Sequence, residues 1–258
     1  MTFNIPVKRN EKLKQLLDFI NADQELQQLW KCANINAVDR IGMNDHGDVH
    51  VRIVANAALR MLRLLMESGI KSGVEINHGL TAQDAELVVV AAACLHDIGI
   101  SVTREDHERY SLILAYPKAR QLLSKIYEEP ALTVMVAEVL HAIIAHDADQ
   151  SCLTLEAGVL KVADATDMTE GRSRITFEAG MLNIHSLSAQ AIKDVKIEKG
   201  EERPLRLSIT LNNSAGVFQL DNLLKHKLKN STLAPYVEVI ARMDGEQTEQ
   251  RLFEVYKI

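Results

Sequence analysis

The chain has 258 residues, of which 47% are hydrophobic and 25% are charged. This composition is typical of a globular protein, and 12 Gly and 5 Pro are too few for a collagen-like or low-complexity chain. The formal net charge of −6 gives no general attraction to nucleic acid, so we expect no such partner. An anionic small substrate would need a locally positive site, such as a metal ion.

The cysteines and the apolar runs indicate a cytoplasmic protein. Cys32, Cys94 and Cys152 are far apart and form no CxxC pair, which argues against a disulfide framework or a thiolate zinc site. The first residues, MTFNIPVKRNEKLKQ, lack the apolar core of a signal peptide. The most apolar run, Leu87 to Leu95, is about half the ~20 residues of a membrane span. We therefore expect a cytoplasmic location, no membrane partner, and a buried helix at this run.

Apolar residues recur at helical spacing through most of the first 190 residues, which predicts a helical bundle. A polar loop over 35–48 interrupts the pattern. The predicted helices cover residues 13–20, 26–30, 51–66, 82–99, 105–115, 117–127, 130–146, 153–169 and 186–193.

The helix that follows Thr81 differs from the others in its composition. Thr81 is the predicted N-cap, and Asp84 three residues later completes a variant of the capping box. The following run, AELVVVAAACLHDIG, is apolar almost all round. Such a helix has no polar face to give to solvent, so we predict that it is central and fully surrounded.

The pattern changes near Asp194. Segments 195–200 and 204–211 alternate apolar and polar residues as strands do, and segments 236–243 and 251–258 read as two further strands. A short amphipathic helix over 217–228 separates the two pairs. We therefore predict a mainly α protein, with a helical domain over 1–193 and a small α+β (ββαββ) domain over 194–258. Two roles are open for the small domain: it forms a homo-oligomer contact, or it covers the functional site.

The residues that carry chemistry begin with His96 and Asp97, which end the most buried-looking helix. An unpaired charge in a dry core costs several kcal/mol or more, and a metal ion would stabilise this pair. Adjacent residues lie about 100° apart on a helix, so both reach one ion only at a helix end, and Gly99 supplies such an irregularity. A His hydrogen-bonded to an Asp in a helix cap is the alternative.

Two further residues extend the doublet into a longer motif. His50 lies at the head of the 51–66 helix after NDHGDV, and Asp164 lies in KVADATDMTEGRSR. This H…HD…D order resembles the HD-domain metal-dependent phosphohydrolases, over residues 44–174. The resemblance implies an all-helical bundle in which His50, His96, Asp97 and Asp164 hold one divalent metal at its centre.

Two more segments, DHERYSLILA and EVLHAIIAHDADQ, resemble the branch of that superfamily with a two-metal centre, and the chain is similar to the symmetrical diadenosine tetraphosphate hydrolases. The resemblance implies that His107 and a second histidine bind another metal, with Asp97 bridging the pair. His141 and His146 are five residues apart, about 140° around a helix, so both cannot easily face one metal. We prefer His146, which ends its helix, and expect His141 to be packed or hydrogen-bonded in the core.

Alternatives remain at two of these positions. His107 has charged neighbours, so it could lie on a solvated helix face. His146 and Asp147 form a second HD doublet that could be the real one. We prefer His96 and Asp97 because their helix is the more buried and the distance from the first histidine leaves room for two helices.

Two arginines follow the Asp164 helix. The stretch ADATDMTEGRSR departs from the A-D-x-x-E-x-x-R-like pattern of the hydrolases, because its acidic residues are Asp167 and Glu170 and its arginines are Arg172 and Arg174. An Arg fork matches phosphate oxygens bidentately, so Arg172 and Arg174 are candidates to clamp a phosphate beside the metal. Salt bridges to Asp167 or Glu170 are the alternative.

The function that these residues favour is metal-dependent phosphate hydrolysis. The resemblance implies one or two divalent ions (Mn, Fe, Ni or Mg), a metal-activated water, and a substrate that is a phosphate ester or anhydride of a nucleotide. Asp97, Arg172 and Arg174 are the expected catalytic residues. Two other classes stay open: a di-iron oxygenase with the same ligand order, and a metal-binding signalling or scaffold module without catalysis.

Overall fold

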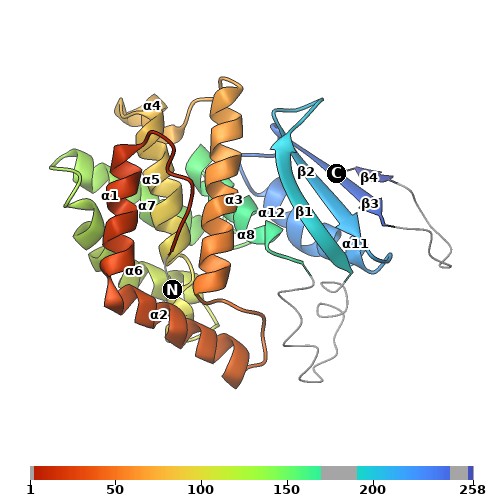
Figure 1. Ribbon diagram of the computed structural model, residues 1–258, viewed down its shortest axis with the longest axis horizontal. Helices are drawn as coiled ribbons and strands as arrows, with labels where there is room; N and C mark the ends of the chain where they lie inside the picture. Colours follow the sequence, from red (N-terminus) through yellow and green to blue (C-terminus); the bar gives the residue numbers. More distant parts are fainter. Residues whose placement is uncertain (1–2, 170–190, 245–254, 258) are drawn as a thin grey trace.

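A computed structural model describes residues 3–169, 191–244 and 255–257. A helical bundle occupies one side of the molecule, and a small sheet with its own helical segment occupies the other (Figure 1). Helices α3 (Asp48–Glu67) and α8 (Leu155–Thr166) lie between the rest of the bundle and this C-terminal layer. The predicted fold class, a mainly α bundle followed by a small α+β unit, is confirmed.

The remaining elements of the bundle follow one another with short connections. They are α1 (Glu11–Ala22), α2 (Gln24–Asn34), the π-helical η1 (Ile35–Arg40), α4 (Gly73–His78), α5 (Ala82–Leu95), the 3₁₀ turn η2 (Ile98–Ser101), α6 (His107–Leu123) and α7 (Ala131–Ala145).

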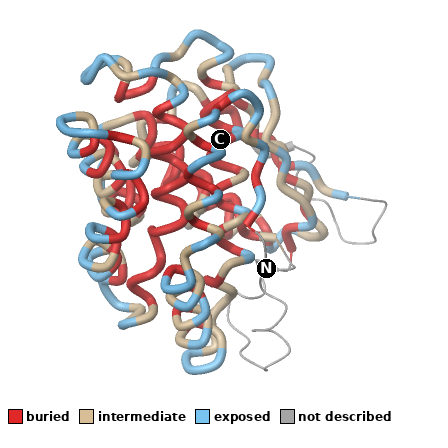
Figure 2. Tube along the Cα trace, turned by 60° about the vertical axis from the view of Figure 1, so that its left-hand side comes forward, coloured by how far each residue is buried: buried red, intermediate tan, exposed pale blue. Residues whose placement is uncertain are grey.

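Helix α5 forms the centre of the bundle, as its composition predicted. Its residues from Asp84 to Leu95 are all buried, and the core around it is continuous (Figure 2). Thr81 and Asp84 form the predicted capping box, with bonds in both directions. Trp30 of α2 donates a 2.8 Å hydrogen bond to the carbonyl of Cys94 near the C-terminal end of α5. This end of α5 is therefore fixed against a neighbouring helix.

Three parts of the bundle differ from the sequence predictions. Helix α6 continues through Pro117, where two separate helices were expected. A proline inside a helix removes one hydrogen bond, and here the burial of Ala115 before Pro117 and of Ala119 and Leu122 after it offsets that loss. The polar 35–48 segment begins with the π-helical turn η1, and the short helix α4 was not predicted.

The sheet has four described strands in the order β1-β2-β3-β4. β1 pairs antiparallel with β2, β2 parallel with β3, and β3 antiparallel with β4. The helical segment α11–η3–α12 connects the two parallel strands and packs against α8, so the predicted ββαββ order is confirmed. The elements are β1 (Ile192–Lys199), β2 (Leu205–Leu211), α11 (Gly216–Gln219), η3 (Leu220–Lys225), α12 (His226–Lys229), β3 (Val237–Met243) and β4 (Val255–Lys257).

The junction between the two parts differs in one respect from the prediction. Of the helix predicted over 186–193, residues 186–190 lie outside the described residues, and Ile192 and Lys193 already belong to β1. The prediction is wrong at this end because Ile192 pairs with Leu211 and extends the ladder. Buried residues of the bundle and of the sheet join in one hydrophobic cluster. The domain division at 193/194 therefore stays a prediction.

Among the residues that the structure describes, no helix has both the length and the apolar character that crossing a membrane would require.

Candidate metal centre

Six side chains from five elements converge on one point inside the bundle, and five of them are buried. Each lies at or near a helix end, where the backbone can aim a side chain along the helix axis rather than away from it. They are His50 in the first turn of α3, His96 and Asp97 directly after α5, His107 at the start of α6, His146 at the C-cap of α7, and Asp164 in the last turn of α8.

The end of α5 explains how adjacent residues reach the same point. The helix stops at Leu95, and Asp97 has φ −106° and ψ 2°, outside the helical region. His96 Nε2 consequently lies 3.2 Å from Asp97 Oδ2. Two side chains that a regular helix would separate by about 100° meet here because the helix has ended.

The first ligand group consists of His50, His96, Asp97 Oδ2 and Asp164 Oδ1. His50 Nε2 lies 3.3 Å from both Asp97 Oδ2 and Asp164 Oδ1, and His96 Nε2 lies 3.9 Å from Asp164 Oδ1. Two imidazole nitrogens and two carboxylate oxygens thus surround a common point.

The second ligand group lies on the other side of the same aspartate. Asp97 Oδ1 is 3.1 Å from His107 Nε2 and 3.6 Å from His146 Nε2. The Asp97 carboxylate therefore presents Oδ2 to the first ligand group and Oδ1 to the second. This is the arrangement that a carboxylate bridging two ions requires.

Three of the histidines are oriented by hydrogen bonds at their outer nitrogens. Each Nδ1 lies against a carbonyl or carboxylate oxygen, which can only accept, so Nδ1 carries the proton and Nε2 of the neutral ring offers a lone pair to the centre. The contacts are His50 with Asp167 Oδ2 (2.6 Å), His96 with Ala93 O (2.9 Å) and His146 with Ile143 O (2.5 Å). Such outer partners are typical of metal-binding histidines.

The first ligand group can be tested for its fit to a metal ion. In the neutral tautomers that their outer contacts favour, the Nε2 atoms of His50 and His96 lie 3.3 Å apart and both face carboxylate oxygens. Acceptors that face acceptors repel one another unless a cation lies between them. The mixture of imidazole and carboxylate donors suits a divalent transition metal. The residues therefore fit such an ion.

The charge state of the two carboxylates also favours a bound cation. Burial alone would raise the pKa of the Asp97 carboxyl, but the electrostatic interaction with His96 and the close contacts with His107 and His146 hold this pKa well below 3.8. Burial likewise opposes ionisation of Asp164, and the charge of Lys227 with the contact to His50 holds its pKa well below 3.8. Both carboxylates are therefore ionised and attract cations into a buried site.

His107 reaches Asp97 because of a close backbone approach. A Cβ on Gly99 would lie 2.1 Å from the carbonyl oxygen of His107 and 2.4 Å from the amide of Ser111, so only glycine fits there. The Gly99 amide also donates to Ser111 Oγ at 2.9 Å. Turn η2 thus packs directly on the start of α6, which sets His107 beside Asp97. The charged neighbours of His107 in the sequence had suggested an exposed helix face as the alternative, but His107 is buried, with only 4% of its surface exposed.

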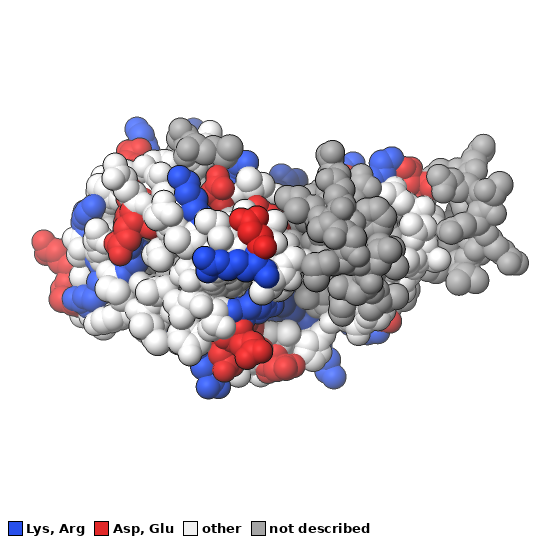
Figure 3. Space-filling model, turned by 90° about the horizontal axis from the view of Figure 1, so that it is seen from below, with Lys and Arg blue, Asp and Glu red and all other residues white. Residues whose placement is uncertain are grey.

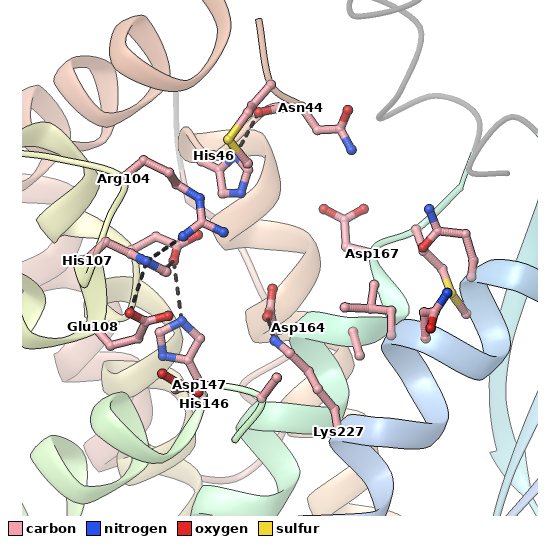
Figure 4. A pocket seen from close by; sticks show the side chains of 18 residues that line it. Asn44, His46, Arg104, His107, Glu108, His146, Asp147, Asp164, Asp167 and Lys227 are labelled. Carbon is pink, nitrogen blue, oxygen red and sulfur yellow. Dashed lines mark hydrogen bonds and ion pairs between the residues drawn. The ribbon is translucent and has the colours of Figure 1, made fainter. Parts of the chain in front are cut away.

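The outer nitrogen of His107 has two neighbours. Arg104 Nη1 lies 2.8 Å from His107 Nδ1, and Glu108 Oε2 lies 3.2 Å from the same atom (Figure 4). When Nδ1 donates to Glu108, Nε2 is available to a metal. When Arg104 donates to Nδ1, Nε2 carries the proton and donates to Asp97.

A cavity of about 580 Å³ opens over the two ligand groups. The bundle supplies one wall, which includes Arg104 and Glu108, and the C-terminal layer supplies another through Gln219 and Lys227 (Figure 4). Lys227 Nζ lies 2.5 Å from Asp164 Oδ2, the carboxylate oxygen that is not part of the first ligand group. Residues of the C-terminal layer thus line the cavity, which fits the second role given for the small domain, and the homo-oligomer contact stays a prediction.

Other candidate residues lie outside the ligand groups. His141 accepts a 3.1 Å hydrogen bond from the Leu153 amide, as expected of a hydrogen-bonded histidine. Asp147 borders the cavity but belongs to no potential metal group among the described residues. Arg172 and Arg174 lie outside the described residues, so their expected role as a phosphate clamp stays a prediction.

Sequence reasoning missed two residues of the site. Asp167 was considered only as an acidic partner of the arginines, yet it orients His50. Lys227 carried no signal at all, because its partner Asp164 lies 63 positions away in the sequence. A His–Asp hydrogen bond could have been suspected from the spacing of two aspartates around the end of α8, whereas the lysine contact depends on the tertiary arrangement alone.

Comparison with known proteins agrees with this geometry. The family model of the HD domain matches residues 49–169, the segment that contains all six converging residues. Residues 49–169 of this chain belong to the HD-domain superfamily of metal-dependent phosphohydrolases. HD domains bind divalent metals and are generally hydrolytic.

Two relatives show how far the similarity runs along the chain. The chain is 41% identical over 234 residues to an uncharacterized protein of Methanocaldococcus jannaschii, covering 91% of this chain and 90% of that protein. It is also 28% identical over 178 residues to ribonuclease Y of Clostridium perfringens, covering 64% of this chain but only 32% of that protein. No solved structure gives a significant match. These matches do not support the expected similarity to diadenosine tetraphosphate hydrolases, which stays a prediction.

Proposed function

We propose that this HD-domain protein is a hydrolase that cleaves a phosphate ester or anhydride of a nucleotide with the help of divalent metal ions. The observation that carries the proposal is the position of Asp97. Its two oxygens face different histidine groups, at 3.1 Å from His107 and 3.2 Å from His96. One carboxylate shared in this way supports a centre of two ions, as the sequence resemblance implies.

Each part of the site has a role in this proposal. The first ligand group would hold one divalent ion, and the second ligand group would hold another with Asp97 shared between them. Ions bound there would polarise a phosphate oxygen and lower the pKa of a coordinated water toward neutrality. Asp167 keeps His50 in the tautomer that directs Nε2 inward. Arg172 and Arg174 are proposed to hold the phosphate.

The cavity supports a small substrate. Its volume of about 580 Å³ falls within the range of roughly 300–1,000 Å³ typical of small-molecule sites. Its lining combines cations (Arg104 and Lys227), which suit a phosphate, with apolar side chains such as Met168 and Leu223, which could pack on the face of a nucleobase. On the face in Figure 3, the described acidic and basic side chains are interspersed rather than gathered by sign. The free thiols of Cys32, Cys94 and Cys152 agree with the proposed cytoplasmic location.

A second candidate is cleavage of an RNA phosphodiester, and the similarity to ribonuclease Y favours it. That similarity reaches about a third of the ribonuclease Y chain, and this chain has a net charge of −6, so we rank it below a nucleotide substrate. The same experiment can distinguish the two candidates.

The test is hydrolysis by protein freed of metal and then loaded separately with Mn²⁺, Fe²⁺, Ni²⁺ or Mg²⁺. Nucleoside phosphates, dinucleoside polyphosphates, cyclic dinucleotides and a short single-stranded RNA are offered, and released phosphate or shortened RNA is measured. We expect hydrolysis of a nucleotide that Asp97→Ala abolishes and Asp147→Ala retains. RNA cleavage alone would favour the second candidate. Metal uptake without any hydrolysis would contradict both, and iron-dependent oxygen consumption would indicate an oxygenase.

A further inference from the structure

The C-terminal layer contributes a charged side chain to the centre of the HD domain. Lys227 lies in α12, a short helix outside the segment that matches the HD family, and it is only 8% exposed. Its ammonium group contacts Asp164 Oδ2 at 2.5 Å, while Asp164 Oδ1 faces His50 Nε2 at 3.3 Å. Asp164 is thus shared between the first ligand group and a lysine from the other layer.

The backbone around Lys227 is fixed to the bundle on several sides. Asn230 Nδ2 donates to the carbonyl of Ala148 at 2.8 Å, and the amide of Cys152 donates to the carbonyl of Asn230 at 3.2 Å. His226 Nε2 lies 2.8 Å from Asp149 Oδ1. These contacts hold α12 against the loop that follows His146, so the position of the ammonium group is defined by the fold rather than by a free surface side chain.

The charges around the cavity give this position a chemical consequence. Asp97, Asp164 and other carboxylates border the cavity, and among its described lining residues the cations are Arg104 and Lys227. Arg104 lies beside His107 near the second ligand group, whereas Lys227 lies across the cavity near the first (Figure 4). A phosphate entering between them would meet a positive group on either side.

We infer that Lys227 binds the phosphate of the substrate, so that the C-terminal layer completes the HD active site with a cation of its own. The inference rests on the proposed function. An ammonium group has three N–H donors, and the contact with Asp164 uses one of them. The others can donate to phosphate oxygens while Asp164 stays in place as a ligand. Charge-assisted bonds of this kind are about twice as strong as neutral ones.

The test measures binding of inorganic phosphate to the Mn²⁺-loaded full chain by calorimetry, for the wild type and for Lys227→Gln, Lys227→Arg and Lys229→Gln. Lys229 is an exposed cation on the same helix, so its replacement changes the net charge equally. We expect Lys227→Gln to weaken phosphate binding about 10- to 100-fold. Lys227→Arg should recover most of the affinity, and Lys229→Gln should bind like the wild type. The dissociation constant for Mn²⁺ should change little in all variants.

Unchanged phosphate affinity in Lys227→Gln would overturn the assignment, and a change confined to Mn²⁺ affinity would show instead that Lys227 only balances the charge of Asp164. A wild type that binds no phosphate would also overturn it. Phosphate binding that depends on Lys227, in a protein that hydrolyses none of the offered substrates, would contradict the proposed hydrolysis but leave the role of Lys227 standing. Where a substrate is cleaved, Lys227→Gln should raise KM more than it lowers kcat.

Discussion

Asp167 Oδ2 accepts a 2.6 Å hydrogen bond from His50 Nδ1, although 117 positions separate the two residues in the sequence. The bond joins the C-cap of α8 to the first turn of α3, the two helices that flank the C-terminal layer. It also decides which nitrogen of His50 carries the proton. The residue that follows the last predicted metal ligand by three positions therefore controls how the first one is presented.

Replacing Asp167 should consequently weaken metal binding without removing a ligand. We expect Asp167→Ala to raise the dissociation constant for Mn²⁺ about 10- to 100-fold, because loss of an outer-shell partner typically has an effect of this size. Asp167→Asn, which can still accept through its amide oxygen, should lose less. Isothermal titration of both variants, with the exposed Asp39→Ala as a control, measures the difference. Equal affinities in all of them would show that His50 needs no such orientation.

A comparison of the two HD doublets tests the centre itself. Asp97→Ala should lose metal and hydrolytic activity together, since both ligand groups depend on its carboxylate. Asp147→Ala should keep its full metal content, because Asp147 only borders the cavity. Elemental analysis and kinetics on the same preparations measure both. Metal retained by Asp97→Ala and lost by Asp147→Ala would reverse the choice between the doublets.

The features of the fold that the sequence predicted are those encoded locally. The all-round apolar pattern of α5 implied a central helix, and alternation over 204–211 implied a strand that buries every second residue, as β2 does. Pro117 misled the prediction because helix continuity depends on packing along both halves of α6. The start of β1 was missed because Ile192 becomes a strand residue only through its pairing with Leu211.

The pH dependence of stability in the metal-free protein follows from two kinds of group. Burial lowers the pKa of His146 below 6.5, so the unfolded chain takes up a proton at this residue before the native protein does. The free energy of unfolding should therefore fall as the pH drops below about 6.5. The pKa values of Asp97 and Asp164 lie well below 3.8, so the stability they contribute is present above that pH and is lost on further acidification.

Denaturant titrations between roughly pH 7 and pH 5 check the histidine part of this prediction. His141→Gln is a useful companion variant, because burial also lowers the pKa of His141 and gives a contribution of the same sign. We expect His146→Gln and His141→Gln each to reduce the slope. A free energy of unfolding that rises toward pH 5 in the metal-free wild type would contradict the assignment.

Gly99 offers a test of how His107 is positioned. A methyl group there would overlap the His107 carbonyl and the Ser111 amide, so η2 and α6 would have to separate. Overpacking of this kind costs about 1–3 kcal/mol, or roughly 2–12 °C in Tm for a chain of this size. Gly99→Ala should also lose part of the bound metal, as the second ligand group opens.

Gly69→Ala is the control: its φ of 83° strains any side chain, yet nothing lies within 4 Å of the added atom. It should lower Tm and keep the metal.

The sequence predicted those residues of the site whose type and order along the chain form a recognisable motif. His50, His96, Asp97 and Asp164 follow a recognisable order, and the structure brings His107 and His146 to the same centre. The orienting and charge-balancing groups carry no such pattern. An aspartate or a lysine is common on any surface, and its role here depends on which helix ends meet in three dimensions.

Removing residues 192–258 tests how far the helical bundle is independent. Thr232 packs so closely on α8 that a Cβ on Gly158 would lie 2.2 Å from its hydroxyl, and Thr232 Oγ1 donates to the carbonyl of Thr154 at 3.0 Å. The sheet and α12 also share one hydrophobic cluster with the bundle. We expect the shortened chain to keep helical circular dichroism but to melt at a lower temperature, bind a dye specific for apolar surface, and hold less than the full complement of metal.

The loop after His146 would lose its contacts with Asn230, so the second ligand group should be affected before the first. A shortened chain that melts with the same Tm and binds the same amount of metal as the full chain would establish the bundle as a self-sufficient domain.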